Sequence, residues 1–312
     1  MIQENSNQII HGMWIGTHLS RLELLSIQSF LDNGHQFWLW TYSDIITPLP
    51  ASVFVKDAGQ IIPAESVFSY RHGNQFGHGK GSYAGFSDVF RYKLLYEYGG
   101  WWADMDITCL RPLDFEKPYV FRSHDVLPVV GNLMKCPAGS KLMWDCYEEA
   151  SQAVDEYNTD WMKPISILNR NIEKHHLSAY IVADLSNVDR WEVVDFYRSY
   201  PARISPHYYV FHWMNEEWRS RGLDKNTCYR YSFLDHLMTK HQVDVIRQSP
   251  SNYIIYIWKW VGYRLIPLFP RPVRITLKVA ARLIKKAFFT LTGTVLMLIP
   301  DHLKANVKKR FI

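Results

Sequence analysis

The stretch GFSDVFRYKLLYEYGGWWADMDITCLRPL, residues 85–113, holds the clearest structural pattern of the chain. Apolar residues recur at helical spacing from Phe86 to Leu94, Ser87 is the expected N-cap, and a double glycine ends the run. Residues 101–110 then read as a strand. A helix followed at once by an apolar strand is the repeating unit of an α/β fold, so the pattern predicts that class.

Shorter apolar runs alternate with helical patterns on both sides of this stretch. Strands are expected at residues 8–15, 37–42 and 52–55, and helices at residues 21–31, 139–153 and 164–175. Such alternation predicts a mainly parallel sheet. The glycine-rich residues 71–85 show no phosphate-binding spacing, which indicates a flexible surface loop.

The expected strand carries two acids. In a strand alternate side chains share a face, so Trp102, Asp104 and Asp106 would point to one side. The carboxylates would then lie about 7 Å apart along the chain, and their repulsion needs a compensating positive charge. A divalent cation supplies that charge, because Mg²⁺ and Mn²⁺ prefer oxygen ligands and complete their shell with substrate phosphates.

The expected helix adds a second pair of charges. Asp88 and Arg91 are three residues apart and so lie on neighbouring faces. A guanidinium presents several donors at once, which suits a diphosphate or sugar hydroxyls. Either pair alone is an ordinary surface feature, since most Asp-x-Asp sequences lie in solvated turns. Together with the double glycine and the apolar run, the two pairs predict a site for a nucleotide diphosphate-sugar.

The complete pattern is Ser-Asp-x-x-Arg-Tyr, Leu-Tyr-x-x-Gly-Gly, an aromatic residue and Asp-x-Asp. It resembles the signature of the DxD-containing sugar transferases that include glycosyltransferase family 32, with bacterial capsular and lipopolysaccharide sugar transferases among them. The opening IIHGMWIG, residues 9–16, is similar to the first strand of these enzymes, and residues 131–137 loosely resemble their acceptor-side segment. The resemblance spans about residues 8–220 and leaves the C-terminal tail outside.

The resemblance implies a GT-A type fold, a nucleotide-binding α/β domain, and assigns roles to single residues. Catalytic roles fall to Asp104, Asp106 and Arg91, and metal binding to Asp104, Asp106 and His212. Donor binding, with a tryptophan against the nucleobase, falls to Trp14, Asp88, Arg91, Trp102, Asp104 and Asn132. Trp102 stands where members often have a tyrosine, and Trp14, His212 and Asn132 also fit ordinary structural roles.

The implied activity is that of a hexosyltransferase. It would move a sugar from a nucleotide-sugar, by analogy a UDP-sugar, to a hydroxyl of a glycan or lipid-linked glycan, with Mn²⁺ or Mg²⁺ and with retention of configuration. Two other classes fit parts of the pattern. A metal-dependent hydrolase of nucleotide-sugars is disfavoured by the lack of His-rich metal spacing, and a non-catalytic membrane- or glycan-binding protein leaves the paired acids and Arg91 unexplained.

The charge distribution separates residues 1–249, the expected catalytic domain, from residues 250–312. The latter contain twelve Lys or Arg and one Asp, whereas the rest of the chain has an excess of acids. Cations alternate with apolar residues at 273–285, as in an amphipathic helix drawn to anionic lipid, and the apolar run 287–299 is too short to span a bilayer. We expect peripheral membrane attachment and no nucleic-acid partner. Packing on the catalytic domain and nucleic-acid binding are the alternatives for this basic tail.

Composition adds two expectations about the environment of the chain. The four cysteines show no close spacing, so they read as reduced thiols, and the N-terminus lacks a basic region followed by an apolar run. We therefore expect a cytoplasmic protein attached to the inner face of the cell membrane. The aromatic content of 15% suits stacking on sugars or nucleobases, membrane contact or an aromatic core.

Overall fold

The computed structural model describes residues 7–249, 270, 272–273 and 276. These belong to two compact units, the first made of Met1–Phe196, Arg203–Thr227 and Leu237–Ile246, the second of Tyr197–Ala202, Cys228–His236 and Arg247–Ile312. The basic tail lies almost wholly outside the described residues. Its amphipathic helices and the domain boundary at residue 249 therefore stay predictions.

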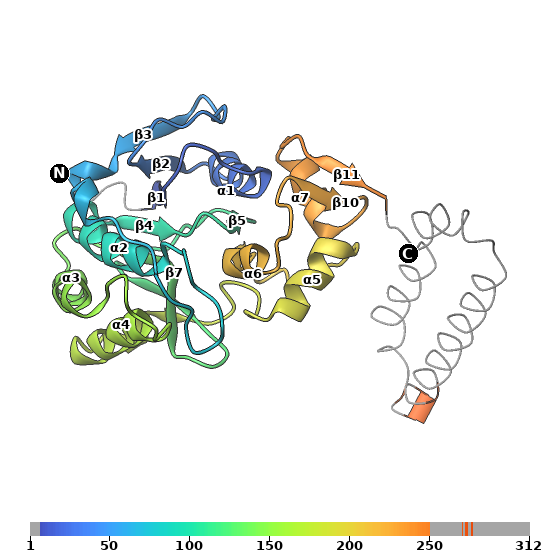
Figure 1. The fold of residues 1–312 in the computed structure, drawn as a ribbon. Helices are drawn as coiled ribbons and strands as arrows, with labels where there is room; N and C mark the ends of the chain where they lie inside the picture. The colour runs from blue at the N-terminus through green and yellow to red at the C-terminus, as the bar shows by residue number, and fades with distance from the viewer. Residues whose placement is uncertain (1–6, 250–269, 271, 274–275, 277–312) are drawn as a thin grey trace. The chain divides into compact units, whose positions relative to one another are not determined.

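A seven-stranded sheet forms the centre of the first unit (Figure 1). The strand order is β3-β2-β1-β4-β7-β6-β8, and pairing is parallel except where β7 runs antiparallel to β4 and β6. The prediction of an α/β fold with a mainly parallel sheet is confirmed. The strands are β1 (Ile9–Trp14), β2 (Gln36–Thr41), β3 (Val53–Asp57), β4 (Gly100–Ala103), β6 (Val120–Ser123), β7 (Val129–Cys136) and β8 (Ile181–Val182).

Two of the helices show how local sequence sets their ends. α1 follows Ser20, which forms a capping box with Glu23. α2 begins at Ala84, before the predicted N-cap Ser87, because the Ser82 hydroxyl accepts a hydrogen bond from the amide of Ala84. The helices are α1 (Arg21–Asp32), α2 (Ala84–Tyr98), α3 (Lys141–Ala153), α4 (Lys163–Lys174), α5 (Trp191–Ser199), α6 (Asn215–Ser220) and α7 (Phe233–Lys240), with short 3-10 helices at Ala58–Gln60, Ala64–Ser66 and Ser178–Tyr180.

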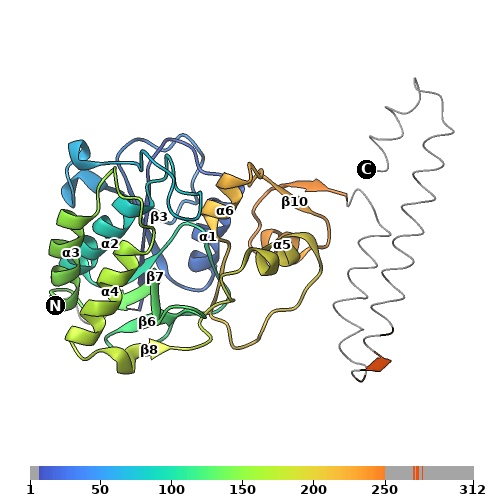
Figure 2. The ribbon, with the colours of Figure 1, turned by 60° about the horizontal axis from the view of Figure 1, so that its bottom comes forward.

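Side chains of β2 alternate between two layers of helices. The Phe37 ring lies 5.8 Å from that of Phe30 in α1, whereas the Trp40 ring lies 6.4 Å from that of Phe90 in α2. Side chains three residues apart on a strand point to opposite faces. α1 therefore covers one face of the sheet, and α2 lies with α3 and α4 on the other (Figure 2).

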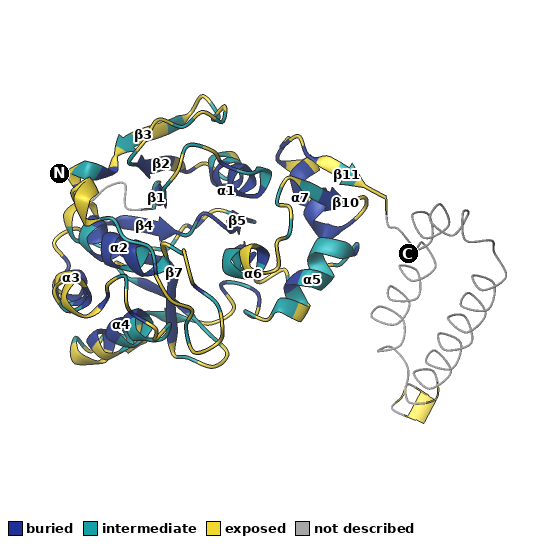
Figure 3. Cartoon of the chain, viewed as in Figure 1, coloured by how far each residue is buried: buried dark blue, intermediate teal, exposed yellow. Residues whose placement is uncertain are grey.

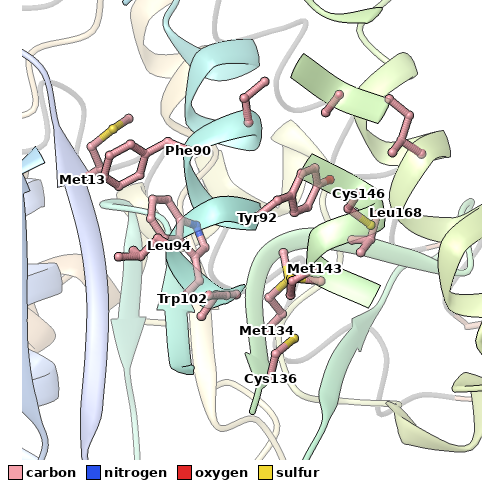
Figure 4. Packing of buried hydrophobic residues seen from close by; sticks show 14 of the residues in the cluster. Met13, Phe90, Tyr92, Leu94, Trp102, Met134, Cys136, Met143, Cys146 and Leu168 are labelled. Atoms are coloured by element: carbon pink, nitrogen blue, oxygen red, sulfur yellow. The ribbon is translucent and has the colours of Figure 1, made fainter. Parts of the chain in front are cut away.

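A hydrophobic core lies between the sheet and α2, α3 and α4 (Figure 4). Phe90 and Leu94 of α2 belong to this core together with Trp102 of β4 and Met134 of β7, and all four are buried. The central strands are buried along their length, as the dark blue in Figure 3 shows. Each such side chain contributes on the order of 2 kcal/mol. This packing holds α2 firmly against the strand that precedes the two acids.

The predicted strand over residues 101–110 is wrong in its middle. β4 ends at Ala103, residues 104–106 form a turn closed by a 3.0 Å hydrogen bond from Ile107 N to Asp104 O, and β5 (Ile107–Cys109) follows. The strand is interrupted because the chain changes its strand-pairing partner here. β4 pairs with β1 and β7, whereas β5 leaves that sheet and pairs antiparallel with β9 (Val210–His212). The two acids therefore project from a turn and not from one face of a strand.

The middle residue of the turn, Met105, anchors it in the core. Met105 is buried, and it fits against β1 only because residue 12 is glycine. A Cβ atom at Gly12 would lie 2.8 Å from Met105 Sδ and 2.8 Å from the tip of the Phe37 ring. Packing therefore fixes the turn between its two carboxylates.

The glycine-rich segment before α2 is hydrogen bonded and not free. Two backbone hydrogen bonds close its base, since Gly81 N donates to Tyr70 O and Tyr70 N donates to Ser82 O. Gly79 N donates to the Glu216 carboxylate of α6 at 2.9 Å. The segment thus joins the start of α2 to α6.

The second unit is described only in part. The Tyr197 and Phe233 rings lie 5.3 Å apart, and Arg247 Nε donates to the Asp235 carboxylate at 2.7 Å. A two-stranded sheet joins β10 (Thr227–Tyr229) to β11 (Ile246–Gln248). None of the helices in the described part of the chain has the length and apolar character needed to cross a bilayer.

His11 is a buried titratable group at the centre of the sheet. Its Nδ1 accepts a hydrogen bond from Trp40 Nε1 at 3.1 Å, so Nε2 carries the proton and donates to Gly99 O at 3.1 Å. Burial lowers the pKa of His11 to about 3. The folded chain therefore requires a neutral imidazole at this position.

This requirement predicts acid sensitivity. Since unfolding restores an ordinary pKa of 6.5, the contribution of His11 to the free energy of unfolding is complete above pH 6.5 and is lost as the pH falls toward 3, at up to about 1.4 kcal/mol per pH unit. The variant His11→Gln cannot titrate there. Urea unfolding from pH 8 to pH 4 should show the stability gap between the two proteins narrowing below pH 6.5. A gap of constant size would contradict the prediction.

Candidate functional site

The turn at residues 104–106 presents Asp104 toward α2. Asp104 Oδ1 accepts a 2.7 Å hydrogen bond from Trp102 Nε1 and lies 3.1 Å from Arg91 Nη2. Burial raises the pKa of Asp104, Arg91 opposes the rise, and the charge of Asp106 adds to it. The two carboxylates therefore interact electrostatically, although they share no strand face.

Arg91 joins the helix to the turn. Its guanidinium is buried and lies 3.2 Å from Asp88 and 3.1 Å from Asp104. Burial works against its charge, but the two carboxylates raise the pKa of Arg91. Burial raises the pKa of Asp88 to about 6, against the opposing effect of Arg91. The predicted Asp88 and Arg91 pair is thus a buried part of the same site as Asp104.

Asp106 is held by segments far along the chain. Because Ile107 of β5 pairs with His212 of β9, the imidazole comes beside the turn, with His212 Nε2 3.3 Å from Asp106 Oδ2. The same oxygen accepts a 2.5 Å hydrogen bond from the amide of Asn215 at the start of α6. Burial opposes ionisation, but His212 and this amide lower the pKa of Asp106. Asp106 is therefore ionised at neutral pH.

His212 bridges two carboxylates. Its Nδ1 lies 2.8 Å from Asp189 Oδ1, while Nε2 faces Asp106. Burial opposes protonation, but Asp189 and Asp106 together raise the pKa of His212 to about 10. The imidazole is thus a cation in which both nitrogens are engaged. The structure gives His212 this bridging position beside Asp106, and its role as a metal ligand stays a prediction.

Trp14 lies at the end of β1 and reaches the site through Lys225. Lys225 Nζ lies 5.5 Å from the Trp14 ring, 3.0 Å from Asn215 Oδ1, and in a close ion pair with the buried Glu23. Trp14 Nε1 donates to His18 O at 3.0 Å. The partly exposed indole is thus linked to the network that contains Asp106, and its contact with a nucleobase stays a prediction.

Two other predicted donor contacts have different surroundings. Trp102 is 1% exposed and its indole donates to Asp104 Oδ1, so the structure shows it supporting Asp104, while its donor contact stays a prediction. Asn132 is buried in β7, where its carbonyl accepts a 2.9 Å bond from the amide of Asp104 and its Oδ1 accepts from Arg122. Within the described part of the chain, the Asn132 side-chain amide nitrogen makes no hydrogen bond and remains available as a donor.

The carboxylates of the turn suit a hard divalent cation. Asp104 and Asp106 bring two carboxylates to one turn, and oxygen ligands are those that Mg²⁺ and Mn²⁺ prefer. The described residues contain no cluster of three His, Cys, Asp or Glu side chains able to hold a metal ion. Two protein oxygens with substrate phosphates completing the shell is the arrangement typical of Mg²⁺ sites.

Several residues of the site were missed by the sequence analysis. They come from segments remote from residues 85–113 and carry no local spacing that marks them. Only strand pairing and loop packing bring them to the turn. They are Glu23, Arg122, Asn187, Asp189, Asn215 and Lys225.

Gly131 tests how closely the site is packed. A Cβ atom there would lie 2.8 Å from Arg91 Nη1, so Gly131→Ala must push the guanidinium away from Asp88 and Asp104. We expect a loss of about 1–3 kcal/mol in the free energy of unfolding. Gly73→Ala is the control, since its Cβ would meet no atom nearer than 3.6 Å. Equal denaturation midpoints for the two variants would refute this account.

One family model matches the part of the chain that contains the turn and α2. Residues 34–124 match the family described as the glycosyltransferase sugar-binding region containing a DXD motif. The matched region contains Asp88, Arg91, Asp104 and Asp106, and so holds the turn and the helix that faces it. No curated protein matches the chain.

Solved structures are similar in part. The PaToxG glycosyltransferase is 15% identical, with a TM-score of 0.39 over 54% of this chain and 68% of its own. A transferase mutant that carries cysteine-to-serine substitutions is 9% identical, with a TM-score of 0.38 over 55% of this chain and 85% of its own. The narrower resemblance to glycosyltransferase family 32 stays a prediction. Residues 34–124 are thus similar to the DXD-containing glycosyltransferase sugar-binding region, and the described residues have a mixed α/β fold with a mainly parallel sheet.

Proposed function

We propose that the chain is a glycosyltransferase that takes a sugar from a UDP-sugar with the help of Mn²⁺ or Mg²⁺ and passes it to a glycan or lipid-linked glycan. The observation that carries the proposal is the buried guanidinium of Arg91, which lies between Asp88 and Asp104. Asp104 is on the same turn as Asp106. Arg91 neutralises part of the acidic charge and leaves carboxylate oxygens for a cation. A diphosphate would bring the oxygens that complete the cation's shell.

Asp104 and Asp106 would hold the cation. When bound, it would neutralise negative charge that builds up on the departing nucleotide diphosphate. The residues around the turn keep both carboxylates in place: Trp102 holds Asp104, and the amide of Asn215 holds Asp106. Because these contacts exist before substrate arrives, little reorganisation is needed during the reaction.

The remaining residues would position the donor. Arg91 offers guanidinium donors and Asp88 a carboxylate acceptor, a combination that suits sugar hydroxyls. Asn132 adds an amide donor, and Trp14 a flat surface for the nucleobase. We propose retention of the anomeric configuration by analogy with the resembled enzymes, and we assign no residue as a nucleophile.

The metal role of the turn is tested by Asp106→Asn. The substitution keeps the size of the side chain but removes the charge that would hold the cation. We expect metal-dependent release of UDP from a UDP-sugar to fall on the order of 100-fold or more, while circular dichroism stays that of the wild type. A panel of UDP- and GDP-sugars with Mn²⁺ or Mg²⁺ identifies the donor beforehand.

Binding provides a second readout for the same variant. Mn²⁺ and UDP together should raise the melting temperature of the wild type and should leave that of Asp106→Asn unchanged. At one hundred times the dissociation constant, binding adds about 2.7 kcal/mol to the free energy of unfolding. Asp44→Asn, a change at an exposed residue, is the control. Normal turnover by Asp106→Asn would refute the metal site. Sugar release that needs no acceptor and is not stimulated by one would indicate a hydrolase.

The basic tail leads to a proposal about location. Twelve cationic side chains and one acid in residues 250–312 favour attachment to the anionic inner face of the cell membrane, with the catalytic site in the cytoplasm. Such attachment suits a lipid-linked acceptor, as in capsule or lipopolysaccharide assembly. It rests on the sequence of the tail alone.

Charge reversal in the full chain tests this attachment. We expect the fourfold variant Arg274→Glu, Lys278→Glu, Arg282→Glu and Lys285→Glu to lose more than tenfold in binding to phosphatidylglycerol vesicles, since each cation contributes about 1 kcal/mol near such a surface. Co-sedimentation measures the binding, and phosphatidylcholine vesicles are the control. A wild-type chain that ignores both vesicles, or a variant that binds as well as wild type, would contradict the proposal.

A further inference from the structure

Arg122 connects the two carboxylates of the turn through separate routes. On one side its Nη1 donates to Asn132 Oδ1 at 3.2 Å, and the Asn132 carbonyl accepts the amide of Asp104. On the other side it forms two 2.7 Å hydrogen bonds with Asp189, whose Oδ1 also holds His212. His212 in turn faces Asp106. One guanidinium therefore closes a ring of side chains around the turn.

An irregularity in the sheet brings Arg122 to this position. Phe121 of β6 pairs with Met134 of β7, but the next residue, Arg122, pairs with Val130, so the register shifts between them. The surplus residues lie on β7 and include Asn132, whose carbonyl turns to the amide of Asp104. Bulges next to functional sites commonly re-aim a side chain. Here the shift points both Arg122 and Asn132 at the site.

Asn187 fixes the far side of the ring. Its Oδ1 accepts a 2.7 Å bond from the amide of His212, its Nδ2 donates to His212 O at 3.1 Å, and its own carbonyl accepts from Arg122 Nη2 at 2.8 Å. The loop that carries Asn187 and Asp189 therefore holds both the backbone and the imidazole of His212. Neither β5 nor β9 alone would fix the imidazole.

The energetics argue against a purely stabilising purpose. Arg122 is 2% exposed and Asp189 11%, so both charges are removed from water. A buried ion pair usually gains little over well-packed apolar side chains, because desolvation offsets the attraction. The buried Nε of Arg122 also lacks a hydrogen-bond partner among the described residues. What the pair provides is geometry: two parallel hydrogen bonds allow one orientation only.

We propose that Arg122 and Asp189 are positioning residues that set the relative placement of the Asp104 and Asp106 carboxylates for a divalent cation. The inference rests on the proposed metal-dependent function and adds to it the residues that determine the geometry of the turn. Neither residue touches the cation or the donor. Their removal leaves both carboxylates present but incorrectly spaced.

The test uses Asp189→Asn and Arg122→Lys in the full chain. Asparagine keeps the shape of Asp189 without its charge, and lysine keeps the charge of Arg122 without its planar fork. We expect Mn²⁺ affinity, measured by titration with electron paramagnetic resonance, to fall about 10- to 100-fold in each variant. The double variant should be no worse than the poorer single one, because both act through one ring. Excess Mn²⁺ should restore part of the lost turnover.

Asp145→Asn is the matched control. Asp145 also accepts hydrogen bonds from a histidine and a cation, His175 and Lys174, both at 2.8 Å, but it joins α3 to α4 and lies outside the ring. The Mn²⁺ affinity of the Asp145→Asn protein should equal that of the wild type. Folded Asp189→Asn and Arg122→Lys proteins with wild-type Mn²⁺ affinity would overturn the inference, as would an equal loss in the control.

Hydrogen exchange separates this inference from the proposed function. Without any metal, the amides of residues 100–113 should exchange faster in Asp189→Asn and Arg122→Lys than in wild type or Asp145→Asn, because the ring holds the turn. A wild-type chain that binds no Mn²⁺ would refute the metal role but leave this readout intact. Unchanged exchange in both variants would refute the positioning role even if Asp106→Asn behaves as expected.

Discussion

The balance of buried charge is the constraint on which the site depends. Ionised groups lose several kcal/mol of hydration on burial unless an opposite charge and hydrogen bonds compensate. The network around the turn contains more carboxylates than cations, so its positive groups cannot neutralise it fully. The proposed divalent cation would add positive charge there, and each protein charge must be held close to its partner. The carboxylates are Asp88, Asp104, Asp106 and Asp189, and the cations are Arg91, Arg122 and His212.

The sheet supplies this arrangement by ending one strand early. β1 and β4 are parallel neighbours, so their carboxyl ends lie at the same edge of the sheet. Trp14 is the last residue of β1, and Asp104 directly follows β4. That edge is where ligands bind in open α/β sheets. The chain then changes partner at the turn, and β5 leaves the sheet to pair with β9. This departure brings His212 to Asp106 from a segment more than one hundred residues away.

Apolar packing and the polar network have separate roles. The core between the sheet and α2 fixes the helix that carries Arg91, and Met105 fixes the turn against Gly12. The polar ring then orients side chains on this rigid base. Close packing explains why small residues matter: a methyl group at Gly131 would displace the guanidinium on which Asp88 and Asp104 rely.

By itself, the sequence determined the α/β class and the helix before the double glycine, and it marked Asp88, Arg91, Asp104 and Asp106 as candidate site residues, because these follow from spacings within about twenty residues. It erred on the strand at residues 101–110, since apolar alternation does not reveal where a strand changes its partner. Only the tertiary structure decided that Trp102 supports Asp104 from the core, that His212 bridges two acids, and that Arg122 and Asp189 belong to the site. Contacts between residues so distant along the chain depend on strand register and loop packing, and no local pattern records either of them.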